Sequence, residues 1–235
     1  MERLVRGFWG PRPETEAEVA TRCVGFLTRL GAIFPGLPTK WHGVRDQGSE
    51  TIVPADADAV AAHLRAVAGD GNDPSAVGHR IALYATAAEH TAIDIAGNAG
   101  GRPQFAPHAI VVQVDGPGGD DRALLATLRA LAEEWDIDWG DVTDDDLMDE
   151  LEDAGLDPGS PTAGRALFLS RGRAARVSGA PLPVGAEPAP HAGAILDLSS
   201  LQSTEAVVAV NRSLEATGAL QPLPRPMTGP KLPAP

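Results

Sequence analysis

The sequence predicts an α+β fold: a single domain in which helices pack on a central sheet that is mostly antiparallel or mixed. Segments with helical spacing of apolar residues interleave with strand-like segments, without the regular strand–helix–strand alternation of parallel α/β proteins. The length of 235 residues is enough to bury one large core without disulfides or a structural metal. We expect residues 1–220 to form this domain and residues 221–235, which hold six prolines, to be a disordered tail.

The first part of the chain is predicted to hold a strand, a helix, a short strand and a second helix. Residues 3–9 alternate in the manner of a strand and are stopped by Gly-Pro-Arg-Pro. In residues 14–34, apolar side chains recur at intervals of three and four, which indicates a helix. After a loop that carries Trp41, we expect a strand at residues 51–53 and a helix over about residues 56–67.

The middle of the chain is predicted to form three strands and then a helix. The strands are expected at residues 80–87, 90–96 and 108–115, the last of which is rich in β-branched residues. The helix over residues 120–135 follows a Gly-Pro-Gly-Gly turn. This turn lacks the Lys-Ser/Thr pair of a phosphate-binding loop and is followed by acidic residues, so we interpret it as structural.

The C-terminal part is predicted to contain two helices and two strands. Thr143, with Asp146 three residues later, resembles a capping box and predicts a short helix that runs to about residue 154. Strands are expected at residues 165–170 and 194–198, separated by a stretch rich in proline and glycine. A helix over residues 203–217 follows.

Negative charge is concentrated in one part of the chain. The formal net charge is −13, yet residues 133–157, here named the acidic segment, contain no Lys or Arg. The segment holds thirteen carboxylates: Glu133, Glu134, Asp136, Asp138, Asp141, Asp144, Asp145, Asp146, Asp149, Glu150, Glu152, Asp153 and Asp157. The other 19 acidic residues equal the 19 Lys and Arg of the chain. The segment predicts a basic or cationic partner and argues against binding to nucleic acid or to an anionic membrane, both of which it would repel.

The distribution of apolar residues suggests where the protein acts. The N-terminus has no apolar core long enough for a signal peptide, and no stretch approaches eighteen apolar residues, so we expect a cytoplasmic location.

The single cysteine, Cys23, lies in an apolar stretch and is predicted to be a small buried hydrophobe. Arg171, Arg173 and Arg176 are too few to indicate nucleic-acid binding, and we expect them to pair with the acidic segment.

The acidic segment also allows an enzymatic interpretation. Asp136, Asp138 and Asp144–Asp146 offer the oxygen ligands that Mg²⁺ prefers, and clustered carboxylates can serve as a general acid and base. No EF-hand pattern, His-Glu-x-x-His or Gly-x-Ser-x-Gly completes such a site. We therefore predict no enzyme activity, no metal and no cofactor, and keep a Mg²⁺-dependent hydrolase as the alternative.

Four tryptophans stand out in a chain with one tyrosine. Trp9 and Trp41 lie close to glycines, which indicates rings packed over bare backbone turns. Trp135 and Trp139 lie among aspartates. This combination is typical of protein interfaces, where a tryptophan that loses its water on binding supplies affinity and nearby charges guide the approach of the partner. We predict a partner-binding surface that consists of Trp135, Asp136, Asp138, Trp139, Asp141, Asp144, Asp145, Asp146, Asp149 and Glu150.

Two motifs carry a resemblance to a known family. Trp9-Gly10-Pro11-Arg12-Pro13-Glu14-Thr15 and Trp135-Asp136-Ile137-Asp138-Trp139-Gly140-x-Val142, with the closing strand and helix around residues 193–220, are similar to the immunity protein 52 family. The similarity extends to about Pro224. The residues that match the family's motifs, and that we expect to be structural, are Trp9, Gly10, Arg12, Trp41 and Gly140.

The resemblance implies an α+β protein that neutralises a cognate bacterial toxin, often a nuclease of the restriction-endonuclease fold. A nuclease presents a basic groove to its polyanionic substrate, and an acidic inhibitor is complementary to such a groove. Electrostatic steering would also speed the capture of the toxin. A secretion-system adaptor, which binds an effector without inhibiting it, is the other alternative.

Overall fold

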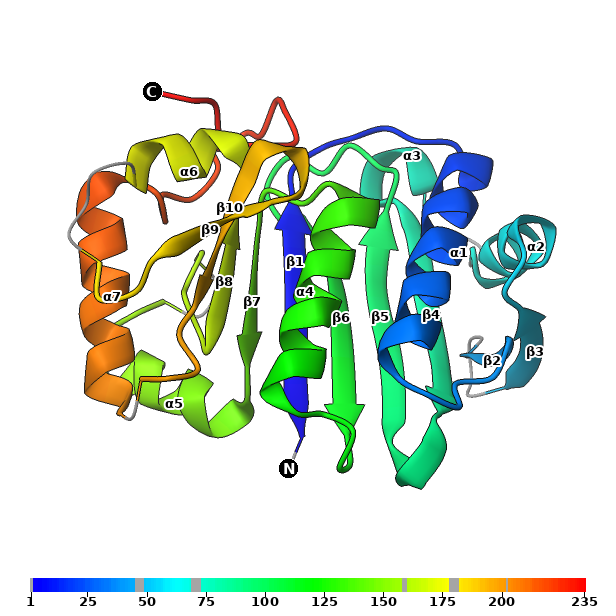
Figure 1. Ribbon diagram of the computed structural model, residues 1–235. Helices are drawn as coiled ribbons and strands as arrows, with labels where there is room; N and C mark the ends of the chain where they lie inside the picture. Colours follow the sequence, from blue (N-terminus) through cyan, green and yellow to red (C-terminus); the bar gives the residue numbers. More distant parts are fainter. Residues whose placement is uncertain (1, 45–48, 69–72, 158–159, 178–181, 202) are drawn as a thin grey trace.

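The computed structural model describes residues 2–44, 49–68, 73–157, 160–177, 182–201 and 203–235. Within these residues ten strands form one antiparallel sheet, with the strand order β3-β2-β4-β5-β6-β1-β7-β8-β10-β9 (Figure 1). The predicted α+β class, with a mostly antiparallel central sheet and helices packed on it, is therefore confirmed.

The elements follow one another with short connections. The strands are β1 (Arg3–Trp9), β2 (Lys40–Val44), β3 (Glu50–Pro54), β4 (His79–Thr86), β5 (Ala92–Ala99), β6 (His108–Asp115), β7 (Trp139–Thr143), β8 (Ala166–Leu169), β9 (Ala186–Ala189) and β10 (Gly193–Asp197). The helices are α1 (Glu16–Ile33), α2 (Ala57–Val67), α3 (Pro74–Val77), α4 (Asp121–Trp135), α5 (Asp145–Asp153), α6 (Arg171–Val177) and α7 (Thr204–Thr217), with short 3₁₀ turns at Ala88–His90 and Pro190–Ala192.

Local sequence explains where the long helices begin. Thr15 caps α1 in a full capping box with Glu18, which satisfies amides that would otherwise lack partners at the helix start. Asp120 caps α4 through the amide of Ala123. The α5 helix begins one residue later than the capping-box pattern predicts, because Asp144 rather than Thr143 accepts the hydrogen bond of the Leu147 amide.

Several short elements differ from the prediction. Trp41 lies in strand β2 and not in a loop, and the segment after Trp135 contains strand β7. The arginine cluster of residues 171–176 lies in helix α6, for which no helix was predicted. Elements of four to seven residues such as β9 and α6 are too short for an apolar repeat to show in the sequence, so tertiary contacts determine them.

The two faces of the sheet are covered differently. On one face, alternate residues of every central strand are buried beneath α1, α2 and α4, as the β1 residues Val5, Gly7 and Trp9 illustrate. On the other face, α6 and α7 cover only β8 and β10, through a second core that contains Leu167, Leu169 and Leu196. Strand β8 is buried on both faces for this reason.

The rest of that second face lies beside the α5–α7 side of the molecule and is here named the open face. Its residues form rows across the strands. The first row is Ile52, His42, Tyr84, Asp94, Gln113 and Leu4. The second row is Ala82, Ala96, Val111 and Arg6, and the third is Arg80, Asn98, Ala109 and Phe8. These side chains are exposed or half-buried, whereas most of the residues that alternate with them in the strands are buried.

The proline-rich tail, predicted to be disordered, is instead docked on the domain. Leu223, Met227 and Leu232 are buried in a cluster with Trp139. The backbone amide of Leu232 donates to Asp138, and the carbonyl of Pro230 accepts from the Gly10 amide. The apolar side chains between the prolines hold the tail in place. The prediction of disorder rested on the proline content and did not take these side chains into account.

Candidate interaction surface

The acidic segment divides into two halves with different environments. Its first half, up to Asp144, runs from the end of α4 through strand β7 and is mostly buried. Its second half is helix α5 with the turn that follows, and its carboxylates are exposed. Charge that is concentrated in the sequence is therefore split in space between structural ion pairs and one acidic helix.

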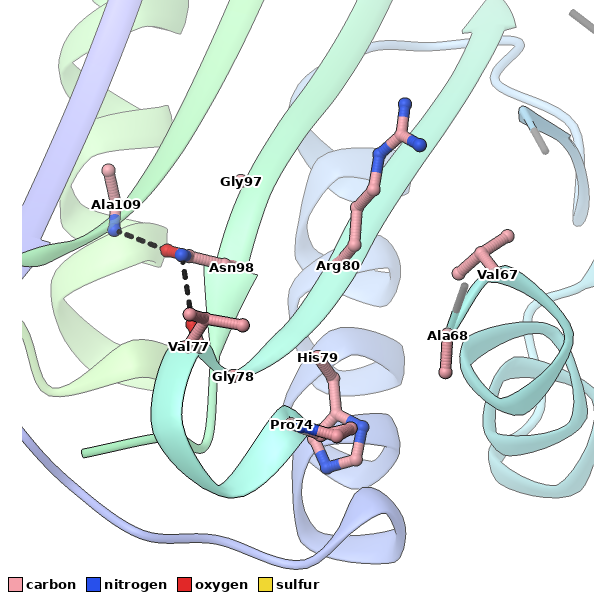
Figure 2. Close-up of a pocket in the computed structure, with 10 residues that line it drawn as sticks. All are labelled: Val67, Ala68, Pro74, Val77, Gly78, His79, Arg80, Gly97, Asn98 and Ala109. Atoms are coloured by element: carbon pink, nitrogen blue, oxygen red, sulfur yellow. Dashed lines mark hydrogen bonds between the residues drawn. The ribbon is translucent and has the colours of Figure 1, made fainter. Parts of the chain in front are cut away.

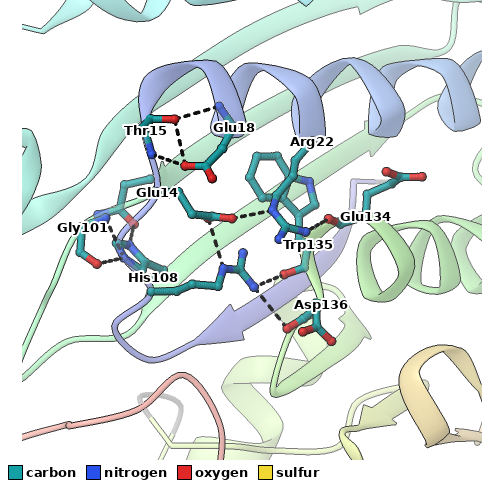
Figure 3. Close-up of polar contacts among 11 residues, drawn as sticks. Glu14, Thr15, Glu18, Arg22, Gly101, His108, Glu134, Trp135 and Asp136 are labelled. Carbon is teal, nitrogen blue, oxygen red and sulfur yellow. Dashed lines mark hydrogen bonds and ion pairs between the residues drawn. The ribbon is translucent and has the colours of Figure 1, made fainter.

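The two distinctive sequence motifs form one structural unit (Figure 3). The rings of Trp9 and Trp135 stack with their centroids 5.8 Å apart. One guanidinium nitrogen of Arg12 donates to the carbonyl oxygen of Trp135 at 2.7 Å, and the same group lies over the Trp9 ring. Arg22 adds a hydrogen bond to the Glu134 carbonyl. These donors satisfy carbonyls at the end of α4, where helical partners run out.

Asp136 ends helix α4 in a left-handed conformation, with φ 45°. Its side chain is half-buried and pairs with Lys231 of the tail. Aspartate tolerates this backbone region better than most residues, so its place at the helix end has a local structural reason.

Asp138 and Trp139 bind the C-terminal helices to the sheet. Asp138 is fully buried and accepts hydrogen bonds from Ser170 at 2.7 Å and from Arg173 at 2.8 Å. Trp139 lies between the ring of Phe8, at a centroid distance of 4.9 Å, and the guanidinium of Arg173, also at 4.9 Å. The expected pairing of the arginine cluster with the acidic segment is confirmed for Arg173.

Asp141 and Asp144 are also paired within the chain. Arg6 donates to both carboxylate oxygens of Asp141, at 2.9 and 2.6 Å. Asp144 pairs with Arg3 at 2.9 Å and Arg165 at 3.0 Å. Burial alone would raise the pKa of Asp144, but the Leu147 amide and the two guanidinium groups stabilise the charged form, and the net effect lowers the pKa.

These contacts correct half of the predicted partner-binding surface. Five of its ten residues are buried: Trp135, Asp138, Trp139, Asp141 and Asp144. Each of the three buried carboxylates has an arginine partner in the chain, and the two tryptophans pack against other aromatic rings. A partner cannot reach these side chains, so they hold the fold together and are not surface anchors.

The exposed remainder of the predicted surface lies on α5. Four of the predicted residues, Asp145, Asp146, Asp149 and Glu150, are exposed on this helix, as are Glu152 and Asp153. The helix contains no Lys or Arg. Its apolar residues Leu147 and Leu151 face inward, so the outward surface is almost entirely carboxylate.

A groove of about 510 Å³ runs between α5 and α7. Its lining includes Val208 and Ala209 and the charged residues Glu150, Asp153, Glu205 and Arg212. Because the carboxylates outnumber the one arginine and lie beside methyl groups, the groove favours the aliphatic stem and charged head of a lysine or arginine.

The carboxylates of the enzymatic alternative do not converge. Asp138 and Asp144 pair with different arginines, and Asp136 pairs with Lys231. Among the residues that the structure describes, no group of three His, Cys, Asp or Glu side chains is arranged to hold a metal ion. The hydrolase alternative therefore gains no support from the geometry.

The remaining motif residues have packing roles. A Cβ atom on Gly10 would collide with the Gly229 backbone of the tail, and one on Gly140 would collide with the Arg6 carbonyl and Ile137. Trp41 is buried in the main core. Close backbone approaches of this kind admit only glycine.

Of the cations that neutralise the buried half of the segment, the sequence predicted Arg173 but not Arg3, Arg6 and Arg165. Arg3 and Arg6 belong to the N-terminal strand, and Arg165 and Arg173 to the region after α5. A usable signal existed, because Trp139, Asp141 and Thr143 alternate with Gly140 and Val142 in the pattern of a strand. A buried strand with a carboxylate requires a cation from another element, since an unpaired buried charge is costly.

The chain matches a family model and is similar in fold to solved structures. The family model described as Immunity protein 52 matches residues 4–223. A solved structure, the Pseudomonas aeruginosa T6SS protein PA0821, is similar with a TM-score of 0.52 and 13% identity over 92% of this chain and 73% of that chain. This likeness concerns the fold. No curated protein matches the chain. No helix in the described part of the structure is long and apolar enough to cross a membrane.

Proposed function

The chain belongs to the immunity protein 52 family, and from this premise we propose that it binds and neutralises a cognate bacterial toxin, using the exposed carboxylates of α5. The observation that carries the proposal is the environment of α5. It is the one part of the acidic segment whose carboxylates mostly face solvent, and a groove lined by three carboxylates and one arginine lies beside it.

The chemistry of this surface favours a basic partner, and we propose that the toxin is a nuclease. Enzymes that act on nucleic acid carry Lys and Arg around the active site to hold phosphates. A helix that displays six carboxylates and no cation imitates that polyanion and would approach the active-site groove under electrostatic attraction. We place the protein in the cytoplasm, where such a toxin would meet nucleic acid.

The test is co-expression with the toxin encoded beside this gene. Wild-type protein should protect the cells and co-purify with the toxin, and unprotected cells should lose intact DNA or RNA. If the wild type neither protects nor binds, the proposed function fails. A stable complex in which the toxin keeps its activity would instead identify an adaptor, and intact nucleic acid in dying cells would remove the nuclease assignment.

Charge reversals with matched positions test the role of α5. Asp145 and Asp146 are the first two residues of α5, while Asp121 and Asp58 occupy the same positions in α4 and α2. Each pair loses similar helix-dipole stabilisation when changed to lysine, about 0.3–1 kcal/mol per residue. We expect Asp145→Lys with Asp146→Lys to weaken protection, and Asp121→Lys with Asp58→Lys to preserve it. Equal protection by both double variants would exclude α5 from the interface.

A further inference from the structure

The open face is a large surface of the sheet that none of the described helices covers, and it lies directly beside α5. Arg6, in its second row, donates to the sulfur of Met148 on α5 at 3.1 Å. In its first row, Leu4 pairs with Thr143, the residue just before the α5 cap. The acidic helix α5 therefore lies along one border of the open face.

The first row combines apolar groups with one carboxylate. Ile52 is 54% exposed, and the rings of His42 and Tyr84 stack with centroids 4.7 Å apart. Asp94 follows Tyr84 in the row and lies between it and Gln113. No hydrogen bond or ion pair to Asp94 is formed by the part of the chain that the structure describes, and partial desolvation raises the pKa of this carboxyl.

The face continues into a cavity at the other end of these strands (Figure 2). The cavity has a volume of about 390 Å³ and is lined by Arg80, Asn98 and Ala109 of the third row together with Val67 and Val77. The side chain of Asn98 is fixed there by hydrogen bonds with the Val77 carbonyl and the Ala109 amide. Val77 is 45% exposed, so apolar surface is open to solvent at both ends of the face.

The size of the open face fits a protein partner. The first row crosses six strands and the other two rows cross four each, which at about 4.8 Å between strands and roughly 6.8 Å between rows covers on the order of 450 Å². A standard interface buries about 800 Å² on each partner, which the open face and the adjoining α5 supply together. Asp94 is about three strand spacings, roughly 14 Å, from β7, so one partner can cover both features.

We propose that the cognate toxin is seated on the open face, with a lysine or arginine of the toxin paired to Asp94 and apolar side chains of the toxin packed on Ile52, Tyr84 and Val111. The proposal rests on the proposed function and names the surface that carries it. A charge pair surrounded by apolar contacts that exclude water is the arrangement found at the energetic centre of protein interfaces. A basic partner also complements α5, whereas a second copy of this chain, docked about a two-fold axis at this row, would bring the two Asp94 carboxylates together.

Tyr84 gives a direct probe, because it is the only tyrosine of the chain. Oxidative labelling of the purified complex with the toxin encoded beside this gene should leave Tyr84 protected relative to the free protein, as read by mass spectrometry. Labelling of Tyr84 to the same extent in the complex and in the free protein would overturn the proposal.

Two variants test the energetic role of the face. Asp94→Lys should weaken binding to the toxin encoded beside this gene by about 30-fold or more. The substitution places a positive charge opposite the lysine or arginine of the toxin that would pair with Asp94. Ile52→Glu should weaken binding as well. The matched control is Asp58→Lys, which reverses an exposed charge on the helix-covered side and should change the affinity by less than about two-fold. Circular dichroism and thermal melting establish that each variant is folded.

The possible outcomes separate the two proposals. Wild-type affinity for folded Asp94→Lys and Ile52→Glu would overturn the docking surface while the toxin-binding function stands. A wild type that does not bind the toxin defeats the proposed function first. A wild-type dimer that Ile52→Glu dissociates would assign the face to self-association and would also overturn the proposal.

Discussion

At the scale of single residues, the buried half of the acidic segment is a set of compensated charges. Asp138 and Arg173 are both fully buried and pair at 2.8 Å, with Ser170 and the Leu232 amide as further donors. Pairs of this kind add little net stability, yet removal of one partner is costly because a buried charge is left alone. This pair joins β7, α6 and the tail.

Arg173→Met should lower the free energy of unfolding by about 3–5 kcal/mol, because the Asp138 carboxylate stays buried without its cation. Adding Asp138→Asn should restore part of the loss, since asparagine keeps an oxygen for Ser170 and Leu232 without the charge. Urea denaturation of the two variants measures both effects. A double variant less stable than Arg173→Met alone would contradict this account.

Asp144 makes stability depend on acidity. Its pKa in the folded protein lies below the ordinary value of 3.8, so the unfolded chain binds the proton more readily as the pH falls. The stabilisation is present above about pH 4 and is lost as the pH drops through the folded pKa. Asp144→Asn keeps an acceptable helix cap but should flatten this acid limb in unfolding measurements between pH 7 and pH 3. An unchanged limb would assign the acid sensitivity to other groups.

Cys23 should be chemically inert in the folded protein. Burial raises the pKa of its thiol to about 12, so almost no thiolate exists at pH 8. A disulfide reagent such as dithionitrobenzoate should react with it only at the rate at which the protein unfolds, which stopped-flow absorbance in urea can follow. Rapid reaction in the native state would show that the site is open.

At the scale of elements, the sequence was most informative where apolar periodicity was long. The helices α1, α4 and α7 and the strands β4 and β6 lie within a few residues of their predicted bounds. The acidic segment was harder to interpret, because thirteen carboxylates within 25 residues suggest a solvated surface. In the structure, several of these carboxylates are buried and pair with arginines that are distant in sequence, namely Arg3, Arg6, Arg165 and Arg173. Pairing across such separations has no local signature.

The docked tail should stabilise the domain. Deletion of residues 222–235 removes Leu223, Met227 and Leu232 from the cover of Trp139 and should cost about 2–4 kcal/mol, after allowance for the entropy regained by the tail. Acrylamide quenching of tryptophan fluorescence should increase in parallel. Deletion of the exposed residues Ala234 and Pro235 alone serves as the control and should change neither property.

At the scale of the whole molecule, the sheet is covered asymmetrically. Among the described residues, the helices α1, α2 and α4 bury one face of the central strands, whereas the other face is covered mainly over β7, β8 and β10. The uncovered part and the acidic helix α5 lie side by side. The sequence predicted the fold class but not the open face. Alternation within a strand shows that one side of that strand is exposed, but it does not show which residues of distant strands lie on the same face of the sheet.

We propose that this protein neutralises a toxin by occupying it and not by modifying it. The most direct measurement is a titration of purified protein into a fixed amount of active toxin, with toxin activity as the readout. The account predicts a linear loss of activity that ends at a fixed molar ratio, with full recovery when the complex is dissociated. Inactivation of many toxin molecules by each molecule of the protein, persisting after separation, would contradict it.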